Sequence, residues 1–161
     1  MARRLAVIGG NPAGMGAATQ AHRLDGALEI VAFEKTDWTS YSACGIPYVV
    51  GGLVDDLDRL VVRTPQEHRD QSLIDMRTRH EVMAIDLDKR RLEVRDHGHA
   101  RTIQVPFDEL MLGMGARPLR PDLPGIDHRR SISPDLAAHW PQRSRLSGNG
   151  GPRCPSQPAP V

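Results

Sequence analysis

The chain has 161 residues and a net charge of +1. With 39% hydrophobic and 25% charged residues, it suits one globular domain rather than a disordered or low-complexity chain. Only two cysteines are present, which excludes a disulfide framework and favours a reducing compartment. Since the longest apolar runs are too short for a membrane span or a signal peptide, we expect a cytoplasmic protein with no membrane partner.

The first elements are predicted to form a strand–helix–strand unit. Residues 4–8 are a short apolar run that ends at Gly9, as is typical of a buried parallel strand. Residues 14–24 carry small apolar residues at helical spacing, and residues 29–33 form a second apolar run that ends at Glu34. We therefore expect two parallel strands joined by a right-handed helical crossover.

The turn between the first strand and the helix is rich in glycine. A strict dinucleotide-binding pattern has Gly at positions 9, 11 and 14, and here Asn11 occupies the middle position. Glu34 lies 20 residues after Gly14, where a carboxylate can accept both hydroxyls of a ribose. These features predict a dinucleotide site, and Glu34 favours a ribose without a 2′-phosphate. The alternative is a turn needed only for packing, with Glu34 a solvated strand end.

Cys44 lies in a segment of Ser, Gly, Pro and Tyr residues (39–48) rather than in an apolar strand. A dithiol reductase needs a second cysteine nearby, commonly five residues on, but that position is Val49. The other cysteine, Cys154, lies near the end of the chain. Cys44 would then cycle alone, through a mixed disulfide or a sulfenic acid. A buried structural cysteine is the open alternative.

Further elements follow in the second half of the chain. Thr64 and Glu67 form a capping box that opens a short helix. Residues 81–86, 91–96 and 101–105 alternate in polarity and predict an antiparallel meander, and residues 109–112 predict a returning strand. The predicted fold class is therefore α/β, a Rossmann-like parallel sheet with a three-stranded antiparallel insertion.

The last segment of the chain differs from the rest in composition. Residues 129–161 contain five Arg, no Lys, one acidic residue and six of the 13 prolines, with few apolar residues. We expect a folded domain over residues 1–128 and a disordered Arg/Pro/Ser-rich tail over residues 129–161. A nucleic-acid-binding tail is the alternative. No nucleic-acid partner is expected, because the arginines neither cluster nor alternate with aromatic residues.

Together these motifs resemble the N-terminal, FAD-binding part of the pyridine nucleotide–disulfide oxidoreductases, closest to the coenzyme A–disulfide reductase and NADH oxidase branch. The similarity covers roughly residues 3–127 and implies that residues 1–128 form a partial FAD/NAD(P)-binding domain. Its most specific part is the cysteine motif. The matching segments are Val7–Gly10 with Ala13–Met15, Phe33–Lys35, Ser42–Tyr48, His80–Val82 and Gly115–Pro118. This sequence departs from the family at Gly113 and Met114, and at Ala43, where the branch often has Asn.

The resemblance implies FAD as cofactor, NAD(P)H as co-substrate and no metal. It makes Cys44 the catalytic residue and a small-molecule disulfide or thiol, such as coenzyme A disulfide, the partner. The cofactor-binding positions it implies are Gly9, Gly10, Pro12, Ala13, Gly14, Glu34, Lys35, Val82 (through its backbone, to the adenine) and Gly115. The substrate-binding positions it implies are Gly16, Gln20, Arg23, Ser40 and Ser72.

The family also has an NAD(P)H domain, a second half of the FAD domain and a C-terminal dimerisation domain, and members are homodimers. These parts have no counterpart here, so the chain is interpreted as an N-terminal fragment from a truncated or frame-shifted gene. It is expected not to consume NAD(P)H alone, because it has one dinucleotide turn. The alternative is an inactive fragment that binds at most an adenine nucleotide. A plain NAD-dependent dehydrogenase would give Cys44 no role.

Overall fold

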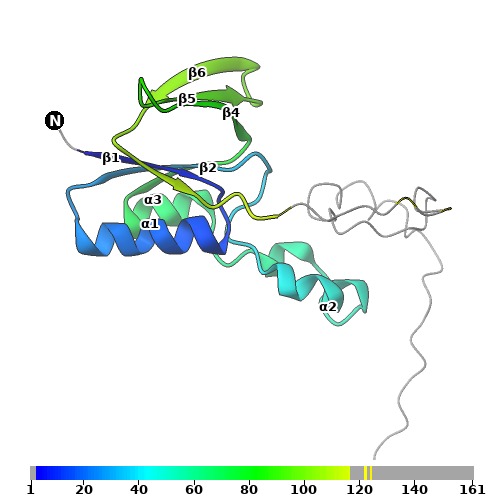
Figure 1. The fold of residues 1–161 in the computed structure, drawn as a ribbon. Coiled ribbons are helices and arrows are strands. Elements are labelled where there is room, and N and C mark those ends of the chain that lie inside the picture. Colours follow the sequence, from blue (N-terminus) through cyan, green and yellow to red (C-terminus); the bar gives the residue numbers. More distant parts are fainter. Residues whose placement is uncertain (1–2, 117–121, 123, 125–161) are drawn as a thin grey trace, which may run out of the picture.

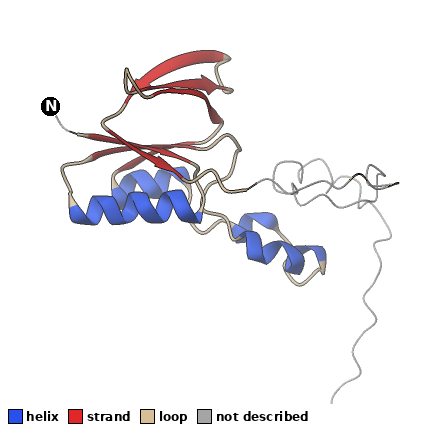
Figure 2. Cartoon of the chain, viewed as in Figure 1, coloured by secondary structure: helices blue, strands red, loops and turns tan. Residues whose placement is uncertain are grey.

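Two sheets pack face to face in the computed structural model, which describes residues 3–116, 122 and 124 (Figures 1 and 2). The first is parallel, has the strand order β3-β2-β1-β7, and consists of β1 (Arg4–Ile8), β2 (Glu29–Phe33), β3 (Ile74–Arg77) and β7 (Glu109–Leu112). The second is antiparallel, has the order β4-β5-β6, and consists of β4 (His80–Asp86), β5 (Arg91–Asp96) and β6 (Arg101–Pro106). The predicted fold class is confirmed.

The parallel sheet is buried on both faces, which explains why β1 and β2 are continuous apolar runs. Side chains alternate between the two faces, so Leu5 and Val7 pack in one core cluster and Ala6 and Ile8 in the other. The first cluster joins the sheet to Met15 of the helical layer. The second cluster joins it to the antiparallel sheet, whose inward-facing members are Leu92, Val94 and Val105.

The helices are α1 (Pro12–Leu24), α2 (Ile46–Val50) and α3 (Pro65–Ser72), with 3₁₀ turns at Ala43–Gly45 and Leu57–Leu60. In Figure 1, α1 and α3 cover one face of the parallel sheet and β4–β6 cover the other. The segment that contains α2 projects beyond the sheet, on the side where β1 ends. Ligands of open α/β sheets bind on the side of the carboxyl ends, so this arrangement already indicates where to look for a site.

Most predicted boundaries agree with the structure. The strands expected at residues 4–8, 29–33, 91–96 and 109–112 are observed with those limits, and the other two antiparallel strands are each one residue longer than predicted. The helix expected over residues 14–24 begins at Pro12, whose fixed φ suits the first helical turn. The capping box is confirmed at α3, where the Thr64 amide donates to Glu67 Oε2 at 2.7 Å.

The sequence analysis missed β3 and α2. Residues 129–161 lie outside the described residues, so the predicted domain boundary at residue 128 stays a prediction. No helix in the described part of the chain is long and apolar enough to cross a membrane.

Candidate functional site

Three backbone segments meet at the glycine turn. Gly9 has a φ of +109°, and a Cβ there would lie 2.1 Å from the carbonyl oxygen of Gly113. A Cβ on Gly14 would lie 2.0 Å from the carbonyl oxygen of Gly9, and one on Gly113 would lie 2.8 Å from the Gly14 nitrogen. The turn therefore packs directly against the end of β7. Gly113, which the sequence analysis noted only as a departure from the family, is required by this close approach.

Asn11 stands where the strict dinucleotide pattern has its middle glycine. Its backbone is extended, with φ −109° and ψ −173°, so this position does not need the left-handed region that glycine tolerates. The Asn11 side chain does not cap α1, its Oδ1 is buried without a partner, and the first turn holds no acidic residue. The first turn of α1 therefore has uncapped N–H groups and no carboxylate to repel an anion, which suits a pyrophosphate. Pro12 and Ala13 in this turn are exposed.

Glu34 joins the turn to the end of β2. Its side chain is only 7% exposed. One carboxylate oxygen accepts the Gly10 N–H at 3.0 Å, and the other accepts the Thr36 N–H at 3.0 Å and the Thr36 hydroxyl at 2.9 Å. The interpretation of Glu34 as a solvated strand end is therefore wrong. The carboxylate is held in a fixed orientation with lone pairs left to accept further hydrogen bonds, whereas Lys35 is exposed.

The loop that carries Cys44 is anchored on the same turn. Thr39 is 1% exposed, and its hydroxyl donates to the Gly10 carbonyl at 2.6 Å, which also accepts the Ser40 N–H at 2.9 Å. Beyond this anchor, the Ser42 N–H donates to the Leu60 carbonyl at 2.8 Å. Cys44 itself is exposed in the 3₁₀ turn Ala43–Gly45, so the interpretation of Cys44 as a buried structural residue is wrong. The loop therefore presents an accessible thiol four residues after Ser40, whose N–H is bound to the glycine turn.

The five positions implied for the substrate fall into two groups. Gly16, Gln20 and Arg23 are exposed on one side of α1 at helical spacing. Ser72 is the last residue of α3, and Ser40 belongs to the cysteine loop and contacts His68 of the same helix. Among the described residues, no hydrogen bond or ion pair joins the two groups.

The sequence analysis missed two residues that contact Ser40 and Ser72. His68 Nε2 lies 2.8 Å from Ser40 Oγ, and Arg63 Nη1 donates to Ser72 Oγ at 3.4 Å. His68 is 2% exposed, and burial, followed by the charge of Arg63, lowers its pKa against the opposing effect of Glu67. The buried residues of α3 are His68 and Ser72, so this helix has no apolar stripe to indicate its inner face. The four-residue spacing of His68 and Ser72, which places both on one side of a helix, was the only feature of the sequence that could indicate this face.

Two further predicted cofactor positions lie away from the turn. Val82 is half-buried on β4, an edge strand, and the β4–β5 register shifts between Val82 and Ala84. Such a bulge leaves backbone groups unpaired on an edge strand. Gly115 has a φ of +70° and is exposed, and a Cβ there would meet no atom within 4 Å. Backbone conformation alone therefore favours glycine at this position.

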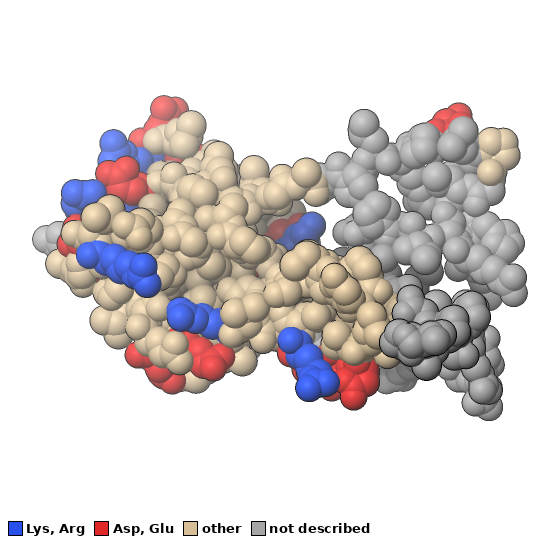
Figure 3. Space-filling view, turned by 90° about the horizontal axis from the view of Figure 1, so that it is seen from below, with Lys and Arg blue, Asp and Glu red and all other residues tan. Residues whose placement is uncertain are grey.

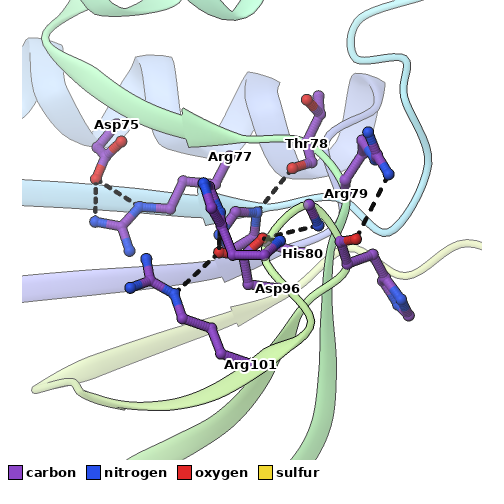
Figure 4. A network of polar contacts seen from close by, with 10 residues as sticks. Asp75, Arg77, Thr78, Arg79, His80, Asp96 and Arg101 are labelled. Carbon is purple, nitrogen blue, oxygen red and sulfur yellow. Dashed lines mark hydrogen bonds and ion pairs between the residues drawn. The ribbon is translucent and has the colours of Figure 1, made fainter.

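A polar network around Asp96 links the end of β5 to the start of β6 (Figure 4). Asp96 is 1% exposed and accepts hydrogen bonds from His99 Nδ1 at 2.8 Å, the Gly98 N–H at 2.9 Å and Arg101 Nε at 3.2 Å. Burial alone would raise the pKa of Asp96, but these hydrogen bonds outweigh it and hold the pKa far below its usual value. The His80 N–H beside this network donates to the Glu34 carbonyl at 2.9 Å.

Charge is dispersed over the helical side of the molecule. In Figure 3, basic and acidic side chains of the described residues interleave around this face rather than gathering in a patch of one sign. Opposite charges of the described residues also form close pairs, such as Arg59 with Asp55 at 2.9 Å. In the part of the chain that the structure describes, no group of His, Cys, Asp or Glu side chains is arranged to hold a metal ion.

Comparisons with known proteins agree on one family. The family model described as pyridine nucleotide-disulphide oxidoreductase matches residues 3–143, which extends past residue 127, where the resemblance was expected to end. An NAD(P)H coenzyme A polysulfide/persulfide reductase of Pyrococcus horikoshii is 34% identical over 136 residues, which cover 84% of this chain and 29% of that protein. A coenzyme A disulfide reductase of Staphylococcus epidermidis is 31% identical over 113 residues, which cover 70% of this chain and 26% of that protein.

Solved structures show the same similarity. The structure of an NAD-dependent persulfide reductase from A. fulgidus matches with a TM-score of 0.79 and 29% identity, over 90% of this chain and 27% of that one. The chain therefore spans less than a third of the length of each of these three proteins.

Proposed function

Because the chain belongs to the pyridine nucleotide-disulphide oxidoreductase family, we propose that it is the first part of a flavoenzyme that reduces a small disulfide with NAD(P)H. Cys44 is the redox residue in this proposal. The names of two relatives, a coenzyme A disulfide reductase and a coenzyme A polysulfide/persulfide reductase, support a coenzyme A disulfide as the substrate class. The observation that carries the proposal is the exposed Cys44 on a loop anchored at the dinucleotide turn through the Gly10 carbonyl.

FAD is the cofactor that fits the turn in this proposal. Gly9 and Gly14 place no side chain in the turn, and Asn11 leaves the N–H groups at the start of α1 uncapped, so a pyrophosphate can approach them. Glu34, already oriented by Gly10 and Thr36, accepts hydroxyls of the ribose. The edge strand β4 at Val82 meets the adenine through its backbone. When bound, FAD passes two electrons from NAD(P)H to the disulfide.

The proposed chemistry of Cys44 is thiol–disulfide exchange. The Cys44 thiolate attacks one sulfur of the substrate disulfide, a new sulfur–sulfur bond forms, and the other half leaves as a thiolate that takes up a proton. Two electrons from NAD(P)H later break the mixed disulfide, which releases the second thiol and regenerates Cys44. Since Cys44 is the only cysteine among the described residues, no neighbouring thiol resolves the mixed disulfide within this part of the chain.

The residues proposed to bind the substrate form two groups that offer different chemical functions. The exposed guanidinium of Arg23 suits a phosphate of coenzyme A, and Gly16 and Gln20 share its side of α1. Ser40 and Ser72 supply hydroxyls from the other group. We assign both groups to the coenzyme A moiety.

The exchange step tests the proposal without requiring the rest of a full-length enzyme. The chain with Cys154→Ser is incubated with coenzyme A disulfide, and the intact mass is measured over time. We expect one coenzyme A adduct, located at Cys44 by peptide mapping, and none in the matched Cys44→Ser variant. A folded chain that forms no adduct contradicts the proposal. If such a chain still binds FAD or ADP, it is the inactive nucleotide-binding fragment.

A further inference from the structure

His68 is a buried titratable residue to which the reaction so far assigns no role. It lies on α3, whose other residues are polar apart from Pro65, and only 2% of His68 is exposed. One ring nitrogen, Nε2, lies 2.8 Å from Ser40 Oγ. The other, Nδ1, is buried and has no hydrogen-bond partner. A buried histidine with one free nitrogen requires an explanation, because unpaired buried polar atoms destabilise a fold.

The free nitrogen decides which tautomer the ring adopts. A buried N–H without an acceptor costs more than a bare ring nitrogen that lacks a donor, so the proton belongs on Nε2. His68 then donates to Ser40 Oγ and does not accept from it. This tautomer also argues against His68 as a base that activates Ser40, because a base would need Nε2 unprotonated and the proton on Nδ1.

Ser40 is held in an unusual backbone conformation. Its φ is +51°, a region that serine rarely adopts, and both of its backbone polar groups are engaged. The Ser40 N–H donates to the Gly10 carbonyl at 2.9 Å, and its carbonyl accepts the Val62 N–H at 2.9 Å. With His68 donating to one of the two lone pairs of Ser40 Oγ, the hydroxyl hydrogen is the one hydrogen-bond donor of Ser40 left to make a new bond.

We propose that His68 is a positioning residue that turns Ser40 into a hydrogen-bond donor for the coenzyme A part of the substrate. The Nε2–H of His68 occupies a lone pair of Ser40 Oγ, so the Ser40 hydrogen faces away from His68 and donates to an acceptor on the substrate. The inference rests on the proposed function, since it assumes that Ser40 contacts a disulfide that exchanges with Cys44. It adds His68 to the residues of the substrate site, and it specifies that Ser40 donates the hydrogen bond to the substrate.

The first test reads the tautomer directly. Long-range proton–nitrogen correlation spectra of the ¹⁵N-labelled chain, recorded above the pKa of His68, show which ring nitrogen carries the hydrogen. We expect the hydrogen on Nε2. A hydrogen on Nδ1 overturns the proposal, because Ser40 would then donate to His68.

The second test uses exchange rates in the Cys154→Ser chain with two probes, coenzyme A disulfide and 2-hydroxyethyl disulfide. His68→Phe keeps a ring of similar shape but removes the donor, and His68→Gln places an amide donor near the position of Nε2. We expect His68→Phe to slow adduct formation with coenzyme A disulfide about tenfold, the effect of one lost directed hydrogen bond. The rate with 2-hydroxyethyl disulfide stays unchanged, and His68→Gln restores most of the rate with coenzyme A disulfide.

A double variant separates positioning from general damage to the fold. In the Ser40→Ala background, His68→Phe has no further effect on the rate if His68 acts through Ser40. An equal loss with both disulfides, or an unchanged rate in His68→Phe, overturns the role of His68. If His68→Phe fails to fold, the exchange rate of His68→Gln and the observed tautomer of His68 still test the proposal. Absence of any adduct in the unsubstituted chain contradicts the proposed function itself, which distinguishes the two failures.

Discussion

The turn at Gly9–Gly14 and the loop that carries Cys44 both follow a parallel strand, yet they are held in different ways. The turn is fixed by backbone contacts so close that a single added Cβ would collide with a carbonyl oxygen. The loop is fixed by a few hydrogen bonds, and its Cys44 thiol is exposed. The two regions meet at the Gly10 carbonyl, which Thr39 and Ser40 share. The conformation of the glycine turn therefore depends on close backbone packing, and that of the cysteine loop depends on hydrogen bonds around an exposed residue.

The largest expected effect comes from adding one methyl group to the turn. Gly14→Ala places a Cβ 2.0 Å from the Gly9 carbonyl oxygen, and we expect it to cost about 3 kcal/mol or more of unfolding free energy. Gly16→Ala is the matched control on the same helix, because a Cβ there would meet no atom within 4 Å. We expect this control to add roughly 0.5–1 kcal/mol. Urea unfolding measures both, and similar values for the two would contradict the close-packing account.

The next effect concerns the polar network beside Glu34. Asp96→Asn removes the charge that His99 and Arg101 stabilise, so the melting temperature at pH 7 should fall. The pKa of Asp96 is lowered in the fold, so its contribution is fully present above its ordinary pKa of 3.8 and is lost as the pH falls below that value. The difference between the two proteins should thus shrink in acid. Asp88→Asn, at an exposed turn residue, is the control. A difference that stays constant down to pH 2 would refute this assignment.

A smaller effect is expected from His68, which contacts the cysteine loop and should change the stability in a different pH range from Asp96. Burial lowers the pKa of His68, so the fold disfavours its charged form. Its stabilising contribution is complete above the ordinary pKa of 6.5 and is lost as the pH falls from there toward the lowered pKa. His68→Gln should lack this component of the pH dependence, although Arg63 and Glu67 remain. Parallel stability curves for both proteins between pH 8 and pH 5 would show that His68 does not titrate in this way.

The smallest effect is expected at the thiol itself. Cys44 is exposed, so Cys44→Ser should change the unfolding free energy by less than about 0.5 kcal/mol, although it abolishes adduct formation. Thr39→Val, five residues earlier, is the contrasting variant because the Thr39 hydroxyl is buried and donates to Gly10. We expect that variant to lose about 1 kcal/mol. A larger loss in Cys44→Ser than in Thr39→Val would mean that the thiol is part of the packing.

The same contrast explains what the sequence could predict. Strands β1 and β2 are buried on both faces, so their apolar runs predicted them with the observed limits. The edge strand β3 alternates Ile74 and Met76 with Asp75 and Arg77, and such a short polar-alternating run gives a weak signal. The burial of Glu34 depends on contacts with Gly10 and Thr36 that only the folded turn creates.

The anchors of the cysteine loop were harder still to predict. His68 and Ser72 are the buried residues of α3, whereas hydrophobic periodicity indicates only apolar faces. The contact of His68 with Ser40 spans 28 residues and depends on how α3 packs against the loop. The capping box of the same helix was predictable, because it depends on Thr64 and Glu67 alone.

The separate roles of the glycine turn and the Cys44 loop are tested most directly by one series of ¹⁵N–¹H spectra of the Cys154→Ser chain. FAD is added first and coenzyme A disulfide second. We predict that FAD shifts the amides of Gly9–Gly14 and Glu34, and that adduct formation then shifts those of Ser40–Gly45. The two sets should meet at Gly10, whose carbonyl binds Thr39 and Ser40. If FAD leaves the turn unchanged, or if the disulfide leaves the Cys44 loop unchanged, the account is contradicted.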